Sequence, residues 1–453
     1  MHPLDTLIKE EFNKIATGEQ YSVKYDIQCR IHTPNETIDA LFVMDFSLLR
    51  DYINNFSDVL TITPVFGSGT VTKSIMPYGE ALEATVTLKP LANVPDYIRS
   101  SIEGMKEYRF KAILFDNGVS AVESNQLSDT SRHQKDIEDI AAVKIQLVNP
   151  LQLKLRGKTF GGIIRDTDPM TAIRLLLTKY SIMGAMEMQH VIKGVDVAPG
   201  HTTLKRDHIM VPHLTPIIRL PMVIDRIVGG LYPTGFQYYL QKDMWYLFSP
   251  FNTKAYGTSD KTLTVINVTK DKLSQLEKTF RLTPTQVIVL STGQVKFDRH
   301  SFKNEINATT GTRYIDAAKV MDGFGNHDGN KFIVNRVDNM NEYTVSTTPG
   351  AIAKESVAKI TSSHNQERSS MAFKNGALLQ FVWENGVDDV IHPGMPIRFI
   401  YMDGREPKQV YGTVCALESS YITESIGVLQ QKFSNNTIIS CFVEDTINQS
   451  EML

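Results

Sequence analysis

The first residues of the chain carry apolar side chains at helical spacing. Four of them recur three or four positions apart: Leu4, Ile8, Phe12 and Ile15. This spacing places them on one side of a helix, which we expect to be capped by Asp5 and to end at Gly18. Acidic residues interrupt the segment where a signal peptide needs an uncharged apolar run, so the pattern indicates a folded helix with nothing that directs export.

Beyond this helix the apolar side chains recur at every second position, which is the period of a strand with one dry and one wet face. The alternation covers residues 21–31, 82–88 and 108–114, and the last stretch ends at the turn sequence Asp116-Asn117-Gly118. Strands with one wet face favour an antiparallel sheet or barrel over a parallel sheet covered by helices. We therefore predict that residues 1–130 form a helix and an antiparallel β-barrel.

The middle of the chain, residues 131–260, mixes both periods and predicts an α+β domain. Two alternating runs flank Asn149-Pro150 and predict strands: Val143, Ile145 and Leu147, then Leu151, Leu153 and Leu155. Asp168-Pro169 supplies a cap and a first-turn proline for a helix, and Leu220-Pro221 opens another that Gly229-Gly230 closes. Alternating aromatic residues over 236–247 predict a hairpin that turns at residues 241–243.

The last third is expected to be β-rich again. We predict a connecting region over residues 261–350 and a barrel-like domain over 351–453. Alternation over 397–414 around Asp403-Gly404 predicts a hairpin with a long tip. Polar stretches at 120–136, 298–331 and 346–374 read as long loops. The fold class predicted for the whole chain is thus α+β, β-rich and multidomain, with antiparallel β-barrels and small α+β insertions.

Composition removes several classes of protein. The chain has 453 residues, 42% hydrophobic and 21% charged, with 47 Lys plus Arg against 50 Asp plus Glu. These values are typical of a soluble globular protein of about three domains, and the net charge of −3 argues against an overall attraction to nucleic acid or anionic lipid. Three cysteines, Cys29, Cys415 and Cys441, are too few for a disulfide framework and are expected to be small apolar core residues.

A search for catalytic motifs finds none, whether a phosphate-binding Walker loop, a nucleophile elbow or a zincin motif. Residues 322–329, between Asp322 and Gly329, are either a surface loop or a cation site, but they lack the oxygen ligands and the glycine placement of a calcium loop. His208 and His213 lie five residues apart, which opposes them in a strand, and His190 and His201 flank a loop. We therefore predict no catalytic, cofactor-binding or metal-binding residues and no cofactor.

Two apolar features have both a core and an interface interpretation. Met183, Met186 and Met188 would suit a core or an adaptable contact surface, because thioether side chains are flexible. The aromatic run over 236–251 would likewise suit a core or a subunit contact.

Several stretches together resemble a known family. They are NETIDALFVM at 35–44 with residues 50–55 and 76–78, LRGKTFGGIIR at 155–165, residues 220–241, and MWYLFSP at 244–250. In this order they resemble the baseplate central hub protein of tailed, particularly contractile-tailed, bacteriophages, and related folds occur in type VI secretion spike proteins. The resemblance covers about residues 20–260, and HPGMP at 392–396 fits a later barrel of such a hub.

The resemblance implies a structural, non-enzymatic virion protein in the tail baseplate, assembled in the host cytoplasm as a late protein. A homotrimer of such a hub would join the tail tube protein above to a spike or tail-tip protein below, contact baseplate wedge proteins and let DNA pass, with no insertion into a membrane. Two alternatives stay open. One is another tail or baseplate component, such as a wedge or tube-terminating protein, and the other is a cell-wall glycan hydrolase.

Overall fold

The computed structural model describes residues 3–17, 23–79, 81–90, 109–114, 140–186, 192–268, 279–292, 296–299, 333–334, 345–346, 372, 376–403, 406–426 and 431–444. The described chain is β-rich, with one large sheet, three small sheets and short helical pieces, which confirms the predicted fold class. None of its described helices combines the length and hydropathy needed to cross a bilayer.

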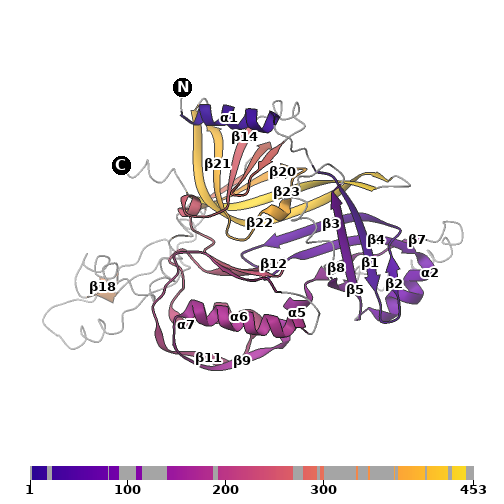
Figure 1. Ribbon diagram of the computed structural model, residues 1–453, viewed down its shortest axis with the longest axis horizontal. Coiled ribbons are helices and arrows are strands. Elements are labelled where there is room, and N and C mark those ends of the chain that lie inside the picture. The colour runs from indigo at the N-terminus through magenta and orange to yellow at the C-terminus, as the bar shows by residue number, and fades with distance from the viewer. Residues whose placement is uncertain are drawn as a thin grey trace.

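Eight strands of the large sheet close into a barrel, here called the first barrel (Figure 1). Every neighbouring pair is antiparallel, and the ring runs β22-β3-β4-β8-β6-β5-β1-β23 and back to β22. The eight strands are β1 (Tyr25–His32), β3 (Phe42–Asp51), β4 (Val59–Gly67), β5 (Glu83–Pro90), β6 (Arg109–Leu114), β8 (Ile145–Val148), β22 (Glu406–Ile426) and β23 (Gln431–Glu444). Short elements decorate it: β2 (Thr37–Asp39), β7 (Ile140–Ala142), α2 (Ser68–Thr70), η1 (Val71–Ile75) and η2 (Met76–Tyr78).

The interior of the first barrel is filled with side chains. In β1 the inward residues Tyr25, Ile27, Cys29 and Ile31 are each at most 4% exposed, and the residues between them face outward. An eight-stranded barrel is just wide enough for its own side chains to fill it. The first barrel is therefore a solid core with a wet outer wall.

The long strands β22 and β23 continue into a second curled sheet, here called the second barrel. Its other strands are β14 (Thr262–Val268), β15 (Phe280–Leu282), β16 (Gln286–Thr292), β17 (Lys296–Arg299), β20 (Gly376–Glu384) and β21 (Pro396–Asp403). β14 is parallel to both β16 and β21, and the remaining pairs are antiparallel. Ser291 Oγ donates to the carbonyl oxygen of Val382 at 2.9 Å, which holds β16 against β20 and curls the sheet.

One hairpin thus belongs to both barrels. The first part of β22 pairs with β21 of the second barrel, and residues 416–421 pair with β3 of the first. Likewise β23 pairs with β20 over residues 436–444 and with β1 at Phe433. Gly412 allows a close approach of the two strands, because a Cβ there would be 2.0 Å from the carbonyl oxygen of Phe442. The shared hairpin fixes the two barrels side by side (Figure 1).

A separate α+β unit with its own apolar core hangs below the barrels (Figure 1). Its elements are α5 (Pro150–Gly157), β9 (Thr159–Thr167), α6 (Pro169–Met186), β10 (Gly194–Val197), β11 (Arg206–Pro216), η3 (Ile217–Arg219), α7 (Leu220–Val228), β12 (Gln237–Gln241) and β13 (Met244–Phe248). β10, β13 and β12 form a small sheet, and β9 pairs with β11 as a ribbon. The remaining short elements outside this unit are η4 (Ala255–Gly257), η6 (Asp388–Val390), β18 (Ile333–Val334) and β19 (Val345–Ser346).

Helix α1 (Pro3–Thr17) covers the outer wall of the second barrel. Ile15, buried at 1% exposure, packs there with four isoleucine and leucine residues of β14, β16 and β21: Ile266, Ile288, Leu290 and Ile400. These strands are apolar on both faces, so the outer face needs a cover. Glu11 of the helix anchors the contact through an ion pair of 2.6 Å with Arg281.

Most predicted elements are confirmed, including the one-sided strands, the helices after Asp168 and Leu220, and the aromatic hairpin. Three details were wrong. Helix α1 begins at Pro3, a residue favoured at a first helical position, so Asp5 lies inside its first turn. The predicted strand at Leu151–Leu155 is helix α5, and the 397–414 hairpin has no long tip because Asp403 pairs with Glu406.

The reason for the helix at α5 is local. Asn149 Oδ1 accepts a hydrogen bond from Leu151 N at 2.9 Å, and Pro150 occupies the first turn. A side-chain cap and a first-turn proline therefore outweighed the alternation of Leu151, Leu153 and Leu155. The predicted loop at 120–136 lies outside the described residues, as does nearly all of the predicted loops at 298–331 and 346–374. The predicted domain boundaries stay a prediction, and strands of the first barrel come from both ends of the chain.

Candidate functional site

A charged residue occupies an inward position of the first barrel. In β3 the side chains of Phe46, Leu48 and Arg50 point inward in turn, and each is at most 1% exposed. A guanidinium that loses its hydration needs charged partners, because the cost of burying it alone is several kcal/mol. Arg50 is the centre of a buried charge network, here called the joint, which consists of Arg50, Asp58, Lys242, Asp388 and Asp389.

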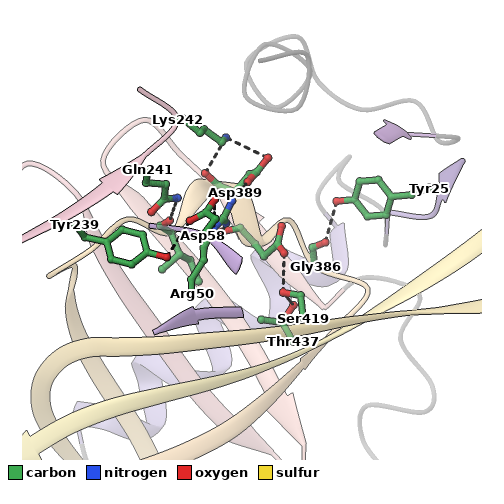
Figure 2. Close-up of polar contacts among 12 residues, drawn as sticks. Tyr25, Arg50, Asp58, Tyr239, Gln241, Lys242, Gly386, Asp389, Ser419 and Thr437 are labelled. Atoms are coloured by element: carbon green, nitrogen blue, oxygen red, sulfur yellow. Dashed lines mark hydrogen bonds and ion pairs between the residues drawn. The ribbon is translucent and has the colours of Figure 1, made fainter. Parts of the chain in front are cut away.

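Arg50 contacts carboxylates from two parts of the fold (Figure 2). Its Nε donates to Asp58 Oδ2 at 3.2 Å, and its Nη2 donates to Asp389 Oδ1 at 2.7 Å. Asp58 precedes β4 of the first barrel, whereas Asp389 lies in η6, between β20 and β21 of the second barrel. The Arg50 side chain therefore ties the two barrels together at a second place beside the shared hairpin.

The turn between β12 and β13 supplies the second cation of the joint. Lys242 and Asp243 have φ angles of 49° and 62°, as a two-residue hairpin turn requires. This turn points Lys242 at η6, where its Nζ lies 3.1 Å from Asp389 Oδ2. Asp389 is thus held between two cations, one from the first barrel and one from the α+β unit.

Other residues of the same hairpin fix the α+β unit to both barrels. Tyr239 donates its hydroxyl hydrogen to Asp58 Oδ1 at 3.0 Å, and Gln241 Nε2 donates to the carbonyl oxygen of Ile391 at 3.0 Å. The Leu240 amide donates to the carbonyl oxygen of Phe56 at 2.8 Å. The hairpin is consequently bonded to the first barrel and to the second by side chains and backbone together.

Asp388 faces the shared hairpin. Its Oδ2 accepts hydrogen bonds from Ser419 Oγ at 2.6 Å and from the Tyr421 hydroxyl at 3.2 Å, both on β22. Ser419 Oγ also lies 3.0 Å from Thr437 Oγ1 of β23. A chain of polar contacts therefore leads from the joint across the hairpin that both barrels share (Figure 2).

The acids of the joint titrate differently because their surroundings differ. Burial acts to raise the pKa of Asp389, but the charges of Lys242 and Arg50 outweigh it and hold this pKa below its ordinary value. Burial and the charge of Asp389 raise the pKa of Asp388, and burial raises the pKa of Asp58 although Arg50 opposes it. Asp389 is therefore the carboxylate that neutralises the two cations, and its neighbour Asp388 is a group whose charged form is disfavoured by its surroundings.

The arrangement suits holding parts together and does not suit acting on a substrate. The side chain of Arg50 is 0% exposed and that of Asp389 is 4% exposed, so neither can meet a molecule from solution. Each charged group already has a partner in another unit. Removing one partner of such a buried network leaves an uncompensated charge. The loss of any one charged residue should therefore weaken the contacts of the whole joint.

A second feature is the outer wall of the first barrel over β1, β5 and β6, here called the charged wall. Two of its cations lie beside acids: Arg30 is 2.6 Å from Asp39, and Arg109 is 4.0 Å from Glu83. Gln28 links the neighbouring strands, donating to Asp26 at 3.0 Å and accepting from Lys89 at 3.1 Å. The wall is therefore polar without being strongly basic.

The residues singled out by sequence do not gather into a site. Met183 is 46% exposed on α6, His208 and His213 are exposed on β11, and His201 stacks edge-on to Tyr232. His190, Met188 and residues 322–329 lie outside the described residues. In the described ranges no three His, Cys, Asp or Glu side chains are placed to hold a metal ion.

The three cysteines are buried free thiols, as expected for apolar core residues. Burial raises the pKa of the Cys29 thiol and that of the Cys415 thiol to about 12, so both stay protonated. The joint itself was missed by sequence reasoning. Its signal was present in β3, where Arg50 occupies a position at which the alternation calls for an apolar side chain.

Comparison with known proteins gives structural likeness alone. No protein-family model and no curated protein matches the chain. The structure is similar to the 43 kDa tail protein of prophage MuSo2 from Shewanella oneidensis, with a TM-score of 0.46, 7% identity, and coverage of 91% of this chain and 96% of that one. The likeness is to a phage tail protein.

Two further structures are similar over most of this chain. One is the E. coli c3393 protein, a type VI secretion component described as similar to bacteriophage tail proteins, with a TM-score of 0.33, 8% identity and coverage of 93% and 75%. The other is the Francisella PdpA–VgrG complex, with a TM-score of 0.33, 9% identity and coverage of 98% and 62%. These likenesses are consistent with the baseplate-hub resemblance found in the sequence. Their TM-scores lie below 0.5, so the proposals below rest on the residues of this chain.

Proposed function

We propose that the chain is a structural protein of a phage tail baseplate, the central hub that joins the tail tube to the spike as a homotrimer and forms part of the DNA channel. The observation that carries this proposal is the pair of barrels fixed side by side by one hairpin, the first of which is filled by its own side chains. Because Tyr25, Ile27 and their neighbours fill the first barrel, nothing can pass through it. A channel can form only between barrels of several copies, with outer walls as its lining.

The number of barrels supports a ring of three copies. Each chain contributes two barrels, so three copies present six, which matches a six-fold tube above while keeping three-fold symmetry for a spike below. The joint serves this role because Arg50 and Asp389 fix one barrel relative to the other and relative to the α+β unit. A ring built from such rigid pairs closes only if the angle within each pair is constant.

The charged wall fits the lining of a DNA channel. A protein that binds DNA neutralises phosphates with unpaired lysine and arginine side chains, and its affinity grows with their number. On this wall Arg30 and Arg109 already lie beside Asp39 and Glu83. DNA would therefore pass without being held, and exchanging Glu83 for lysine would slow its passage.

The experiment that tests the proposal is native mass spectrometry of the purified chain at micromolar concentration, followed by imaging of the assembled particle. We expect a trimer that occupies three equivalent positions at the end of the tail tube. A chain that stays monomeric alone and with its tube and spike partners, or that occupies six equivalent positions, would refute the hub. Six positions would favour a tube-terminating or wedge protein.

The same preparation separates the structural role from a glycan hydrolase. On a gel containing peptidoglycan, the hub proposal predicts no clearing zone. Clearing that follows the purified chain through gel filtration would favour the enzyme.

A further inference from the structure

The outer face of helix α6 combines apolar and cationic side chains without any acid. The whole helix, Pro169–Met186, contains no aspartate or glutamate. Its inner face is buried in the core of the α+β unit, with Ile173 and Leu177 at 0% exposure. Besides the polar Thr171, its outer face exposes five residues that are here called the helix face: Arg174, Leu175, Lys179, Ile182 and Met183.

The helix face exposes more large apolar side chains than is usual for a surface in contact with solvent alone. Leu175 is 62% exposed, Ile182 43% and Met183 46%, and they lie along one side at helical spacing. Several large apolar side chains grouped on one exposed face, with charges at their edge, are typical of a contact surface.

A surface with the opposite charge lies on the first barrel, where β3, β22 and β23 run side by side. We call it the barrel face: Asp45, Leu49, Glu418, Ile422 and Ile438. Glu418 pairs with Leu49 on one side and with Ile438 on the other, so these three form one row across the strands. Leu49 and Ile438 are each 39% exposed and Ile422 is 54% exposed. Its two charged members are acids, and an exposed cation, Lys432, lies further along β23, where it pairs with Ser425.

We infer that the helix face of one copy docks on the barrel face of the next copy of this chain. This inference rests on the proposed ring of three. Each face has three apolar residues and two charged ones, and the charges are cations on the helix and acids on the barrel. Each face is exposed in a single copy, and Figure 1 shows α6 in the lower unit and β3, β22 and β23 above it, so the contact forms between copies.

The lengths of the two faces agree. From Leu175 to Met183 the helix rises about 12 Å at 1.5 Å per residue. From Glu418 to Ile422 the strand advances about 13 Å at 3.3 Å per residue. The apolar residues of the two faces can therefore meet while the cations reach the acids. Because two different surfaces meet, the contact is heterologous and ends in a closed ring when the rotation closes.

The barrel face also leaves the charged wall free. Around the first barrel, β5 and β6 of the charged wall lie on the far side of the ring from β3 and β22, whereas β1 of the charged wall is the neighbour of β23. A neighbouring copy that docks on β3, β22 and β23 would cover the barrel face and leave the part of the charged wall over β5 and β6 open to the channel. The barrel face would thus contact the neighbouring copy, and the charged wall would line the channel.

Charge exchange tests the contact in the full-length chain by mass photometry. Lys179→Glu or Glu418→Lys alone places like charges together, and we expect the concentration at which half of the chain assembles to rise at least about tenfold. The double variant restores the pairing and should assemble as the wild type does. Lys205→Glu, a charge reversal at another exposed lysine of the same unit, is the control and should leave assembly unchanged.

Cross-linking tests proximity directly. The three native cysteines are buried, so Leu175→Cys with Ile438→Cys introduces the reactive pair. Oxidation should give covalent dimers and trimers from the double variant and none from either single variant. A ring of three that is unchanged by both charge reversals and does not cross-link would overturn this contact while leaving the hub proposal intact. A chain that never forms the ring would overturn both.

Discussion

Replacing Arg50 with methionine should lower the free energy of unfolding of both barrels and of the α+β unit, and not only that of the barrel that carries Arg50. The change keeps much of the side-chain volume but removes the cation that contacts Asp58 at 3.2 Å and Asp389 at 2.7 Å. Breaking a buried pair by removing one partner costs about 3–5 kcal/mol, because the remaining charges stay in a place without water. In the variant, Asp389 still contacts Lys242, whereas Asp58 keeps its hydrogen bond from the Tyr239 hydroxyl. We therefore expect a loss of stability near the middle of this range.

The two tryptophans provide a reporter for each side of the joint. Trp245 is buried in the core of the α+β unit, and Trp383 is buried in the second barrel. With Trp245→Phe and Trp383→Phe backgrounds, urea unfolding followed by fluorescence reads each unit alone. In the wild type we expect the two midpoints to coincide, and after Arg50→Met both should fall and separate.

Arg30→Met is the matched control for this experiment. Arg30 lies on the same barrel and contacts Asp39 at 2.6 Å, but its side chain is 57% exposed. An exposed pair of this kind contributes about 0.2–1 kcal/mol. If Arg50→Met lowers stability no more than Arg30→Met does, the joint does not hold the units together and the reasoning is wrong.

Three further predictions concern single elements. Asp389→Asn should lower stability at pH 7, because the depressed pKa of Asp389 contributes stability that is present above its unfolded pKa and is lost as pH falls through its folded pKa. Asp388→Asn should not lower stability at pH 7, because the raised pKa of Asp388 makes its charged form unfavourable at that pH. Urea unfolding midpoints of the two variants at pH 7 compare them directly. Gly412→Ala should prevent stable pairing of the shared hairpin, since its Cβ would lie 2.0 Å from the Phe442 carbonyl oxygen, and a wild-type circular dichroism melt from the alanine variant would contradict this. Deleting residues 1–17 should uncover the isoleucine-rich outer wall of the second barrel and raise binding of an apolar dye, and unchanged dye fluorescence would show that the wall has another cover.

The local parts of the fold could be predicted from sequence because their causes are local. Alternation of one-sided strands identified β1, β5 and β6, and Asp168-Pro169 identified the start of α6, where the Thr171 amide donates to Asp168 Oδ1 at 2.9 Å. The prediction from alternation was wrong at Leu151–Leu155, because the Asn149 cap and Pro150 favour a helical backbone more than the alternating side chains favour a strand.

The joint could not be predicted because its partners are far apart along the chain. Arg50 could be identified as an unusual inward residue of an alternating strand. That its partner would be Asp389, 339 positions away, follows only from the closure of the barrel by β22 and β23. Apolar alternation carries no information about which distant strand lies beside which, and so neither the closed barrel nor the joint was visible in it.

The sharing of one hairpin by two barrels has a consequence for synthesis of the chain. Phe46 of β3 pairs with Tyr421 of β22, so the first barrel cannot close until nearly the whole chain has left the ribosome. At about 5–20 residues per second, the intervening segment takes about 20–75 s to be made. During that interval the early strands present unpaired edges, while the α+β unit, whose elements from α5 to β13 are continuous in sequence, can already fold. Expression at lower temperature or with chaperones that bind exposed strands should therefore raise the soluble yield of this chain more than that of a variant truncated to the α+β unit.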